Sequence, residues 1–513
     1  MSKMMNGTMG KTVILTLLCA VTTGVAKANN LAINSVKIKG RDDTTAWVQF
    51  DISWENSWRH GSGGDPLYFH DAAWVFLKFK ANNGQVWTHA KLKGRGINPD
   101  GYSHGAGTAV EMIVPDDGLG VFIRRAGDGA GTTAVQRVSV VWDIASHNLA
   151  KTDTVLMQVF GLEMCYVAEG AFRVGDGLAT QGQLFEGGGG TNAFLISSAA
   201  AITLADEKGC LWGARQDGAM SMGGVGVIET GFPNGYNAYY CMKYPVTQGQ
   251  YSDFLNTLTR EQQTTRCSAV SEGSYMSDSD GETKNRNTVQ LTVKPDDNES
   301  PCTFATITPD YACCWLSWAD LAAFSDWSGL RPMSELEYEK ACRGPLPAVP
   351  GEFAWGSTKV IKFTDLQGED GSGEEYYEAG NIHCPSNGGP ASGPVRVGIS
   401  ARPGRTREEA GATYWGIMDM SGNLWERPVT IGSSAGRSFR NVHGDGVLTE
   451  AGEANVTSWP GVNAAGIGYR GGAFGQPLAA SNVSDRYNGT YTNRGRWFYF
   501  GGRAVRTAPT VQE

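Results

Sequence analysis

The sequence predicts an α+β protein, with an antiparallel β region followed by a longer region of few helices and much irregular structure. Residues 29–160 are short runs of alternating apolar and polar residues separated by Gly, Asn and Asp, a pattern typical of antiparallel strands joined by turns. After residue 160, three stretches combine helical periodicity with a capping residue at their start, which predicts three helices. The chain has 513 residues, so we expect more than one domain.

The runs in 29–160 predict a β-sandwich that serves as an accessory or docking domain. TTAWVQFDISW and VQRVSVVWDI are two examples, and the turn residues recur at short intervals. Many short strands with regular turn punctuation favour a sandwich over a single open sheet. We therefore expect 29–160 to form one domain and 161–513 to form a second.

Capping boxes predict where the three helices begin. Thr247 with Gln250, Ser317 with Asp320 and Ser334 with Glu337 each place a capping hydroxyl three residues before its box partner. The last helix is expected to stop at Gly344, since glycine commonly follows a helix. Residues 262–300 are polar and acidic with no periodicity, and a long surface loop is expected there.

The first 28 residues resemble a secretory signal peptide. Lys3 and Lys11 precede an apolar run, and Ala26-Lys27-Ala28 fits a cleavage site. The apolar run is too short to span a membrane, and no other run of spanning length occurs. We expect an exported protein, whether periplasmic, cell-surface or secreted. The net charge of −9 argues against nucleic acid as a partner.

Nine cysteines follow residue 160 once Cys19 is removed with the leader. An odd number in an exported protein implies at least one thiol without an intramolecular disulfide partner. A redox or nucleophilic thiol is one interpretation. The other is structural disulfides together with buried thiols.

The C-terminal stretch from Tyr469 to Arg506 has the composition of a recognition surface. Glycine pairs frame a segment rich in Asn, Ser, Thr, Tyr and Arg, residues that supply adaptable hydrogen bonds and rigid contact area. The candidate ligand-binding residues are Ser481, Asn482, Asp485, Tyr487, Asn488, Tyr491, Asn493, Arg496, Trp497 and Tyr499.

Six motifs in order resemble the formylglycine-generating enzyme (sulfatase-modifying factor) family. They are AEGAFRVG, YYCMKYPVTQGQYSDFL, LSWADLAAFSDWSGLRPMSELEYEKACRG, FAWGS, GIMDMSGNLWE, and YRGGAF with FYFGGRAVR. The resemblance covers about 160 to 507 and implies a C-type-lectin-like fold for 161–513. It also implies an oxidase that converts a sulfatase cysteine to formylglycine with copper held by two cysteines.

The residues that this chemistry needs are missing from the expected place. Copper(I) requires soft thiolate ligands, yet no cysteine follows Cys384, and Ala473 and Arg427 replace a serine and a tryptophan of the family pattern. An iron-dependent branch of the family uses a histidine pattern that does not occur here. We therefore expect neither copper nor iron, and no catalytic residues.

Calcium is the metal that the resemblance leaves open. The family's structural calcium sites correspond here to Asn381 and Ile382 and to Asn423, Leu424 and Glu426, and oxygen ligands of this kind suit calcium. The alternative is that Asn423 caps a turn and Glu426 pairs with a core arginine.

Three functions compete at this point. The leading hypothesis is a non-catalytic binding protein whose C-terminal stretch, 476–500, contacts a protein or glycan. That stretch resembles the diversified tails of variable proteins from diversity-generating retroelements. The alternatives are a formylglycine-generating oxidase and a structural component of the cell envelope.

Overall fold

The structure is a computed structural model that describes residues 30–61, 68–178, 182–213, 224–277, 283–384 and 392–510. The predicted signal peptide lies outside these residues. None of the helices in the described ranges has the length and apolar character needed to cross a membrane.

The N-terminal region is antiparallel β structure around one apolar cluster. The longest pairing joins β2 to β8, with Val48 opposite Val140 and Phe50 opposite Val138. β2 also pairs with β3 at Arg59↔His70, which joins these strands into one sheet. The elements are β1 (Ala32–Arg41), β2 (Thr45–His60), β3 (Phe69–Ala81), β4 (Thr88–His89), β5 (Gly96–Ile97), β6 (Val110–Val114), β7 (Val121–Arg125), β8 (Gly129–Asp143) and the 3-10 helix η1 (Ala145–His147).

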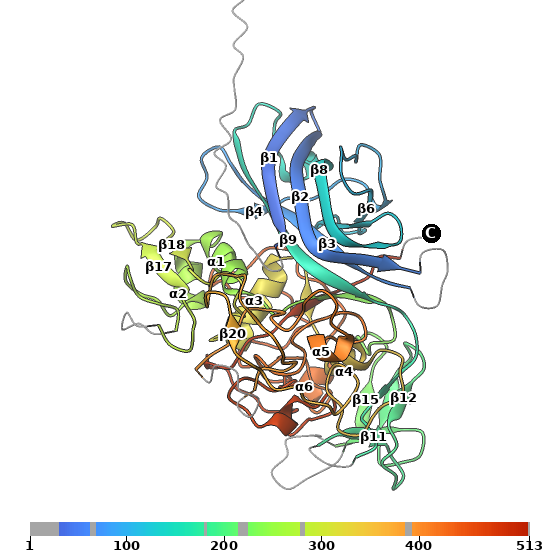
Figure 1. Cartoon of the computed structure of the whole chain (residues 1–513). Helices are drawn as coiled ribbons and strands as arrows, with labels where there is room; N and C mark the ends of the chain where they lie inside the picture. The colour runs from blue at the N-terminus through green and yellow to red at the C-terminus, as the bar shows by residue number, and fades with distance from the viewer. Residues whose placement is uncertain are drawn as a thin grey trace, which may run out of the picture.

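One strand connects this region to the rest of the chain. β9 (Val155–Val167) pairs with β3 over most of its length and with β16 (Tyr239–Met242) at its C-terminal end. β16 pairs in turn with β22 (Ala504–Thr507), which pairs with β19 (Arg331–Pro332). Figure 1 shows β9 running from the upper β region into the lower part of the molecule. The boundary expected between 160 and 161 therefore falls inside a strand that both regions share.

The remaining sheets are small and flank the second region. A four-stranded sheet has the order β11-β14-β13-β15, and three further sheets have two strands each. The strands are β10 (Phe172–Val174), β11 (Leu184–Glu186), β12 (Phe194–Ile196), β13 (Ile202–Leu204), β14 (Leu211–Gly213), β15 (Gly226–Ile228), β17 (Gln290–Val293), β18 (Thr303–Ala305), β20 (Leu366–Gln367) and β21 (Tyr376–Tyr377).

The three predicted helices are confirmed together with their capping boxes. They are α1 (Gln248–Asn256), α3 (Trp318–Trp327) and α4 (Glu335–Arg343), and each has both capping hydrogen bonds. α4 ends at Gly344, as predicted. Shorter helices were not predicted: α2 (Arg260–Arg266), α5 (Arg407–Ala410), α6 (Ser434–Arg437) and the 3-10 helix η3 (Leu478–Ser481).

The long surface loop expected over 262–300 contains two regular elements that were not predicted. α2 occupies its start because Thr259 and Gln262 form a capping box, and β17 lies near its end. Gln263, Arg266 and Leu291 are buried. Residues 278–282 lie outside the described ranges. The polar composition hid these elements because several of the buried side chains are themselves polar.

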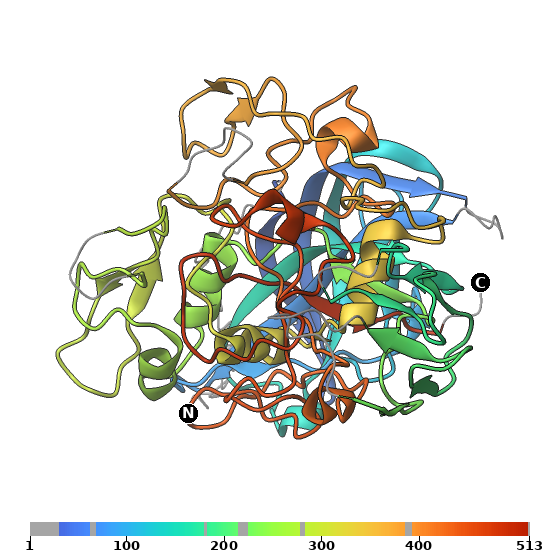
Figure 2. The ribbon, with the colours of Figure 1, turned by 90° about the horizontal axis from the view of Figure 1, so that it is seen from below.

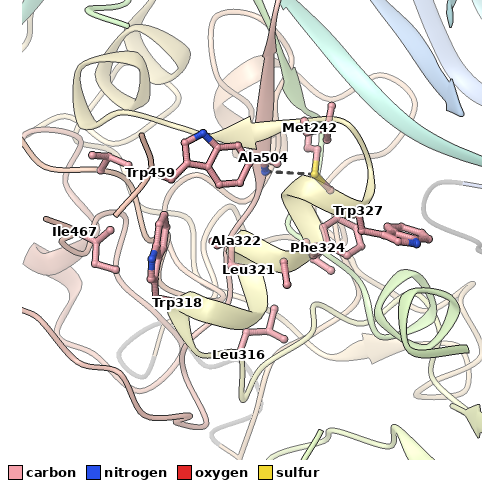
Figure 3. Close-up of a cluster of buried hydrophobic side chains, with 14 of the residues drawn as sticks. Met242, Leu316, Trp318, Leu321, Ala322, Phe324, Trp327, Trp459, Ile467 and Ala504 are labelled. Atoms are coloured by element: carbon pink, nitrogen blue, oxygen red, sulfur yellow. Dashed lines mark hydrogen bonds between the residues drawn. The ribbon is translucent and has the colours of Figure 1, made fainter. Parts of the chain in front are cut away.

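The core of the second region is built from aromatic residues around α3. Trp318 and Trp327 of α3 are buried in its cluster, whereas Trp355 and Trp425 are buried in two smaller, separate clusters. Figure 3 shows Trp318 and Trp459 on one side of α3 and Trp327 at the other end of the cluster. Large rings fill volume efficiently where regular structure is scarce.

Several cysteines contribute to this packing as thiols. Cys165, Cys241 and Cys342 are free and lie together in one apolar cluster. Burial raises the pKa of all three thiols, which keeps them protonated and unreactive at neutral pH. All nine cysteines after residue 160 are free. The structure therefore supports the buried thiols of the second interpretation but not its disulfides.

Candidate functional site

The C-terminal stretch is held on α4 by a buried network of ion pairs. Arg470 contacts Glu335 at 3.0 Å and Glu339 at 2.6 Å, and Arg486 contacts Glu335 at 2.6 Å. All of these side chains are at most 1% exposed. Figure 2 shows the red C-terminal segments near the middle of the molecule, close to the yellow helices α3 and α4.

Helix geometry explains why α4 serves as the anchor. Glu335 and Glu339 are four residues apart and so lie on one face. Burial acts to raise the pKa of Glu335, but Arg486 and Arg470 outweigh it and hold the pKa below its usual value. Glu335 and Glu339 are therefore buried partners of arginine rather than solvated charges. Only Glu337 caps, accepting from Ser334 N at 2.9 Å, and it also pairs with Arg331.

The glycine pair at the start of the stretch turns the chain at this network. Gly471 and Gly472 have φ angles of 84° and 69°, a conformation that glycine adopts at little cost. A Cβ atom on Gly472 would lie 2.2 Å from Ser481 Oγ. The pair therefore needs glycine for both conformation and space.

Four of the predicted ligand-binding residues are buried or form hydrogen bonds within the protein. Ser481 and Asp485 are buried, and Asn482 Nδ2 donates to Gly351 O at 2.6 Å. Arg496 donates two hydrogen bonds to Asp320, at 2.7 and 2.8 Å. Asp485 accepts a hydrogen bond from Tyr487 N, and burial raises the pKa of Asp485 to about 7.

The remaining six predicted residues lie at or near the surface. Tyr487, Tyr491 and Trp497 are 41%, 38% and 46% exposed. Within the described residues, these are the only Phe, Tyr or Trp side chains classed as exposed. Asn488, Asn493 and Tyr499 are partly buried between them.

The rings continue inward from this surface as one chain of contacts. Trp497 stacks near Tyr499, with centroids 6.5 Å apart, and Tyr499 contacts Phe500 at 5.2 Å. Phe500 contacts Tyr469 at 4.8 Å, and Tyr469 contacts Tyr491 at 5.7 Å. We call Tyr487, Tyr491, Trp497 and Tyr499 the aromatic surface.

Arg427 lies under the aromatic surface and was noted in the sequence only as a departure from a family motif. Its guanidinium stacks 4.9 Å from the ring centroids of both Tyr469 and Phe500, and Nη2 donates to Asn493 O. Burial lowers its pKa to about 10. The signal in the sequence was an arginine at a position where the family has tryptophan.

The two predicted calcium segments lie close together, since Asn423 N donates to the backbone oxygen of His383, the residue after Ile382, at 2.9 Å. Their side chains have other partners. Asn381 is bonded to backbone groups of Lys359, Ile361 and Glu408, and Ile382 is buried beside Cys384 in an apolar cluster.

The second segment contains a buried carboxylate oxygen, on Glu426, that could bind a cation. Asn423 exchanges hydrogen bonds with Val395 and has a φ of 62°, and Leu424 is buried. Glu426 Oε1 accepts from Arg503 at 2.6 Å, as the core-arginine alternative predicted, while its buried Oε2 has no partner among the described residues. No group of three or more His, Cys, Asp or Glu that would hold a metal occurs in the described ranges.

The comparison with known families decides the assignment of the second region. Residues 218–470 match the sulfatase-modifying factor enzyme 1-like domain. Just under half of the chain is therefore similar to the sulfatase-modifying factor family. This confirms the resemblance found in the motifs. The aromatic surface lies just beyond the matched residues, and the network of Arg470, Glu335 and Glu339 joins it to the sulfatase-modifying factor domain.

Other comparisons add little. No curated protein matches the chain. Among solved structures, Treponema denticola variable protein 1 is similar with a TM-score of 0.31 and 12% identity, covering 68% of this chain and 96% of that one. Major Tropism Determinant U1 Variant is similar with a TM-score of 0.22 and 12% identity, covering 79% and 73%. TM-scores of this size do not establish a shared fold.

Proposed function

We propose that this protein is a non-catalytic binding protein whose ligand, a protein or a glycan, contacts the aromatic surface. The observation that carries the proposal is the gathering of every exposed aromatic ring of the described residues between 487 and 497. Exposed Tyr and Trp supply large contact area at low entropic cost and dominate binding energy at many interfaces.

The frame beneath these rings supports the same proposal. Arg496 fixes the segment to Asp320 at the start of α3, and Arg470 and Arg486 fix its other end to α4. A surface held rigid before binding loses less conformational entropy when the ligand arrives. Partly buried Asn488 and Asn493 add amide groups between the rings.

The residue types support binding over oxidation. No cysteine follows Cys384 in the sequence, and Cys384 is buried with Phe353 and Trp355. Hydroxyl, amide and aromatic groups hold ligands but are poor copper(I) ligands.

Export and variability of the stretch 476–500 belong to this proposal. Export rests on the leader-like residues 1–28, and N-terminal sequencing of protein recovered outside the cytoplasm tests cleavage after Ala28. Variability rests on the composition of 476–500. A near-identical template repeat and a reverse-transcriptase gene beside this gene would support it.

We also propose that calcium, which the family implies, is held near Glu426 rather than near Asn381. The side-chain amide of Asn381 is fully used, whereas Glu426 Oε2 has no described partner. Burial raises the pKa of both Glu426 and Asp419, and the charge of Asp419 raises that of Glu426 further. A divalent cation held by oxygen ligands would relieve this cost.

The test of binding is a screen of protein and glycan arrays with the exported chain. Tyr491→Ala and Trp497→Ala are expected to weaken binding to any hit at least about tenfold each, the effect of losing an interface anchor. Trp212→Ala, a partly exposed tryptophan on β14, is the matched control. Unchanged binding in both variants would move the site elsewhere. Copper-dependent formation of an aldehyde on a sulfatase peptide would replace the proposal with the oxidase.

A further inference from the structure

A groove runs between the N-terminal β region and α1, far along the chain from the aromatic surface. It has a volume of about 530 Å³ and is lined by β1 and β9 on one side and by α1 and residues 300–303 on the other. A smaller cavity of about 30 Å³ adjoins it and shares Ile33, Val159, Phe160 and Asp253 with it. The cavity exceeds the space that one water molecule needs, about 10–15 Å³.

Asp253 faces both the groove and the inner cavity. On α1, Gln250, Asp253 and Asn256 share the groove side, while Tyr251, Phe254 and Leu255 pack into the core. Gln250 Oε1 is used in the capping box, and Asn256 exchanges hydrogen bonds with Phe304. Among the described residues, none forms a hydrogen bond or ion pair with the Asp253 carboxylate.

Three aromatic side chains, Phe76, Phe160 and Trp327, line the inner cavity together with Asp253. Trp327 lies edge-on to Phe160 at 5.0 Å and to Phe76 at 4.9 Å. Figure 3 shows Trp327 at the end of the core cluster, away from Trp318 and Trp459. The Lys78 ammonium already lies 5.4 Å from the Trp327 ring centroid. The groups in this cavity that favour an added organic cation are therefore the Asp253 carboxylate and the neighbouring Phe160 and Phe76 rings.

Few charged groups line the groove. Lys80 lies on its outer part, with its ammonium 5.0 Å from the Trp87 ring centroid, and burial lowers its pKa. Cys302 also lines the groove, and burial raises the pKa of its thiol. Burial alone raises the pKa of Asp253 to about 7, with no contribution from a charged neighbour.

We propose that this groove binds a primary ammonium group on an alkyl chain, with the ammonium at Asp253 beside Trp327 and the chain along Phe160 and Val159. The small inner cavity fits –NH₃⁺ better than a bulky quaternary head. The source is either a free alkylamine or a lysine side chain of a polypeptide. This site is separate from the aromatic surface and does not depend on it.

The test is isothermal titration calorimetry of the whole chain with n-hexylamine, n-hexanol and N-acetyl-lysine methylamide. Hexylamine is expected to bind and hexanol to bind at least tenfold more weakly. Asp253→Asn is expected to weaken hexylamine binding about tenfold or more. Glu261→Gln, an exposed acid on the neighbouring α2, makes the same change in net charge and is expected to leave binding unchanged.

A second measurement needs no variant. Amines of this type stay protonated between pH 6 and 8, whereas Asp253 becomes ionised over this range. Burial lowers the pKa of Lys78, which lies over the Trp327 ring, to about 7, so its repulsion of a bound ammonium falls over the same range. Affinity is therefore expected to rise at least about tenfold from pH 6 to pH 8. Lys80→Gln should keep this rise and Asp253→Asn should abolish it.

The relative affinities of the two amines distinguish a free alkylamine from a lysine side chain. Tighter binding of the lysine derivative assigns the site to a polypeptide, and tighter binding of hexylamine assigns it to a free amine. Absence of hexylamine binding at millimolar concentration, equal binding of hexanol, or an unaffected Asp253→Asn variant would each overturn the proposal.

Discussion

Replacing Glu335 with glutamine tests whether the buried ion pairs hold the C-terminal stretch in place. Glu335 accepts five hydrogen bonds, from Thr430, Ile431, Arg470 and twice from Arg486. Glutamine keeps one acceptor oxygen but turns an amide NH₂ toward the guanidinium groups. At least two charge-assisted hydrogen bonds are lost, each contributing about 1.5–3 kcal/mol.

The expected loss of unfolding free energy is about 3–5 kcal/mol, the range found when one partner of a buried ion pair is removed. Arg470 keeps its contact with Glu339 at 2.6 Å. The loss of unfolding free energy should therefore be smaller than if the whole network were removed. Urea denaturation followed by tryptophan fluorescence measures the global effect. Hydrogen exchange of residues 469–506 measures whether the stretch itself loosens.

The control is Glu450→Gln, which removes an exposed carboxylate and should change stability by less than about 0.5 kcal/mol. Because the pKa of Glu335 is held below its usual value, its stabilising effect is full above about pH 5 and falls away as the pH drops. A Glu335→Gln protein as stable as Glu450→Gln at pH 7, with unchanged exchange in 469–506, would refute the role of the network.

Three other predictions follow from the site. Arg496→Lys replaces two hydrogen bonds to Asp320 with a single point contact, so unfolding free energy should fall by about 1–3 kcal/mol and binding at the aromatic surface should weaken; equal urea midpoints for variant and wild type would contradict this. Asp485 has a pKa raised to about 7, so the native state binds the extra proton and stability should fall as the pH rises from about 4 to 7. Asp485→Asn should remove that fall. Parallel stability curves for variant and wild type from pH 5 to 8 would contradict this role of Asp485. If calcium binds near Glu426, the thermal unfolding midpoint should be higher in millimolar Ca²⁺ than in EGTA, and Glu426→Gln should show no such difference. Identical midpoints for the wild type with and without calcium would count against the site.

Features that depend on neighbouring residues could be predicted from the sequence. Thr247 with Gln250, Ser317 with Asp320 and Ser334 with Glu337 each satisfy backbone N–H groups within one helical turn, so the helix starts are visible in four consecutive residues. Alternating apolar residues likewise predicted the antiparallel strands of the N-terminal region. The family motifs predicted the sulfatase-modifying factor domain, because each is a short contiguous pattern.

Features that depend on distant residues were decided by the tertiary structure. Glu335 and Arg470 are 135 residues apart and Arg496 and Asp320 are 176 apart, so no local pattern distinguishes these buried pairs from solvated charges. The same holds for β9, whose two sheet partners come from different regions, and for Asp253, which faces a groove that β1 and β9 complete. The sequence by itself determined local caps, strand periodicity and the family resemblance. Only the tertiary structure decided which charged side chains are buried and which aromatic rings stay exposed to solvent, because burial depends on every part of the chain that packs against a side chain.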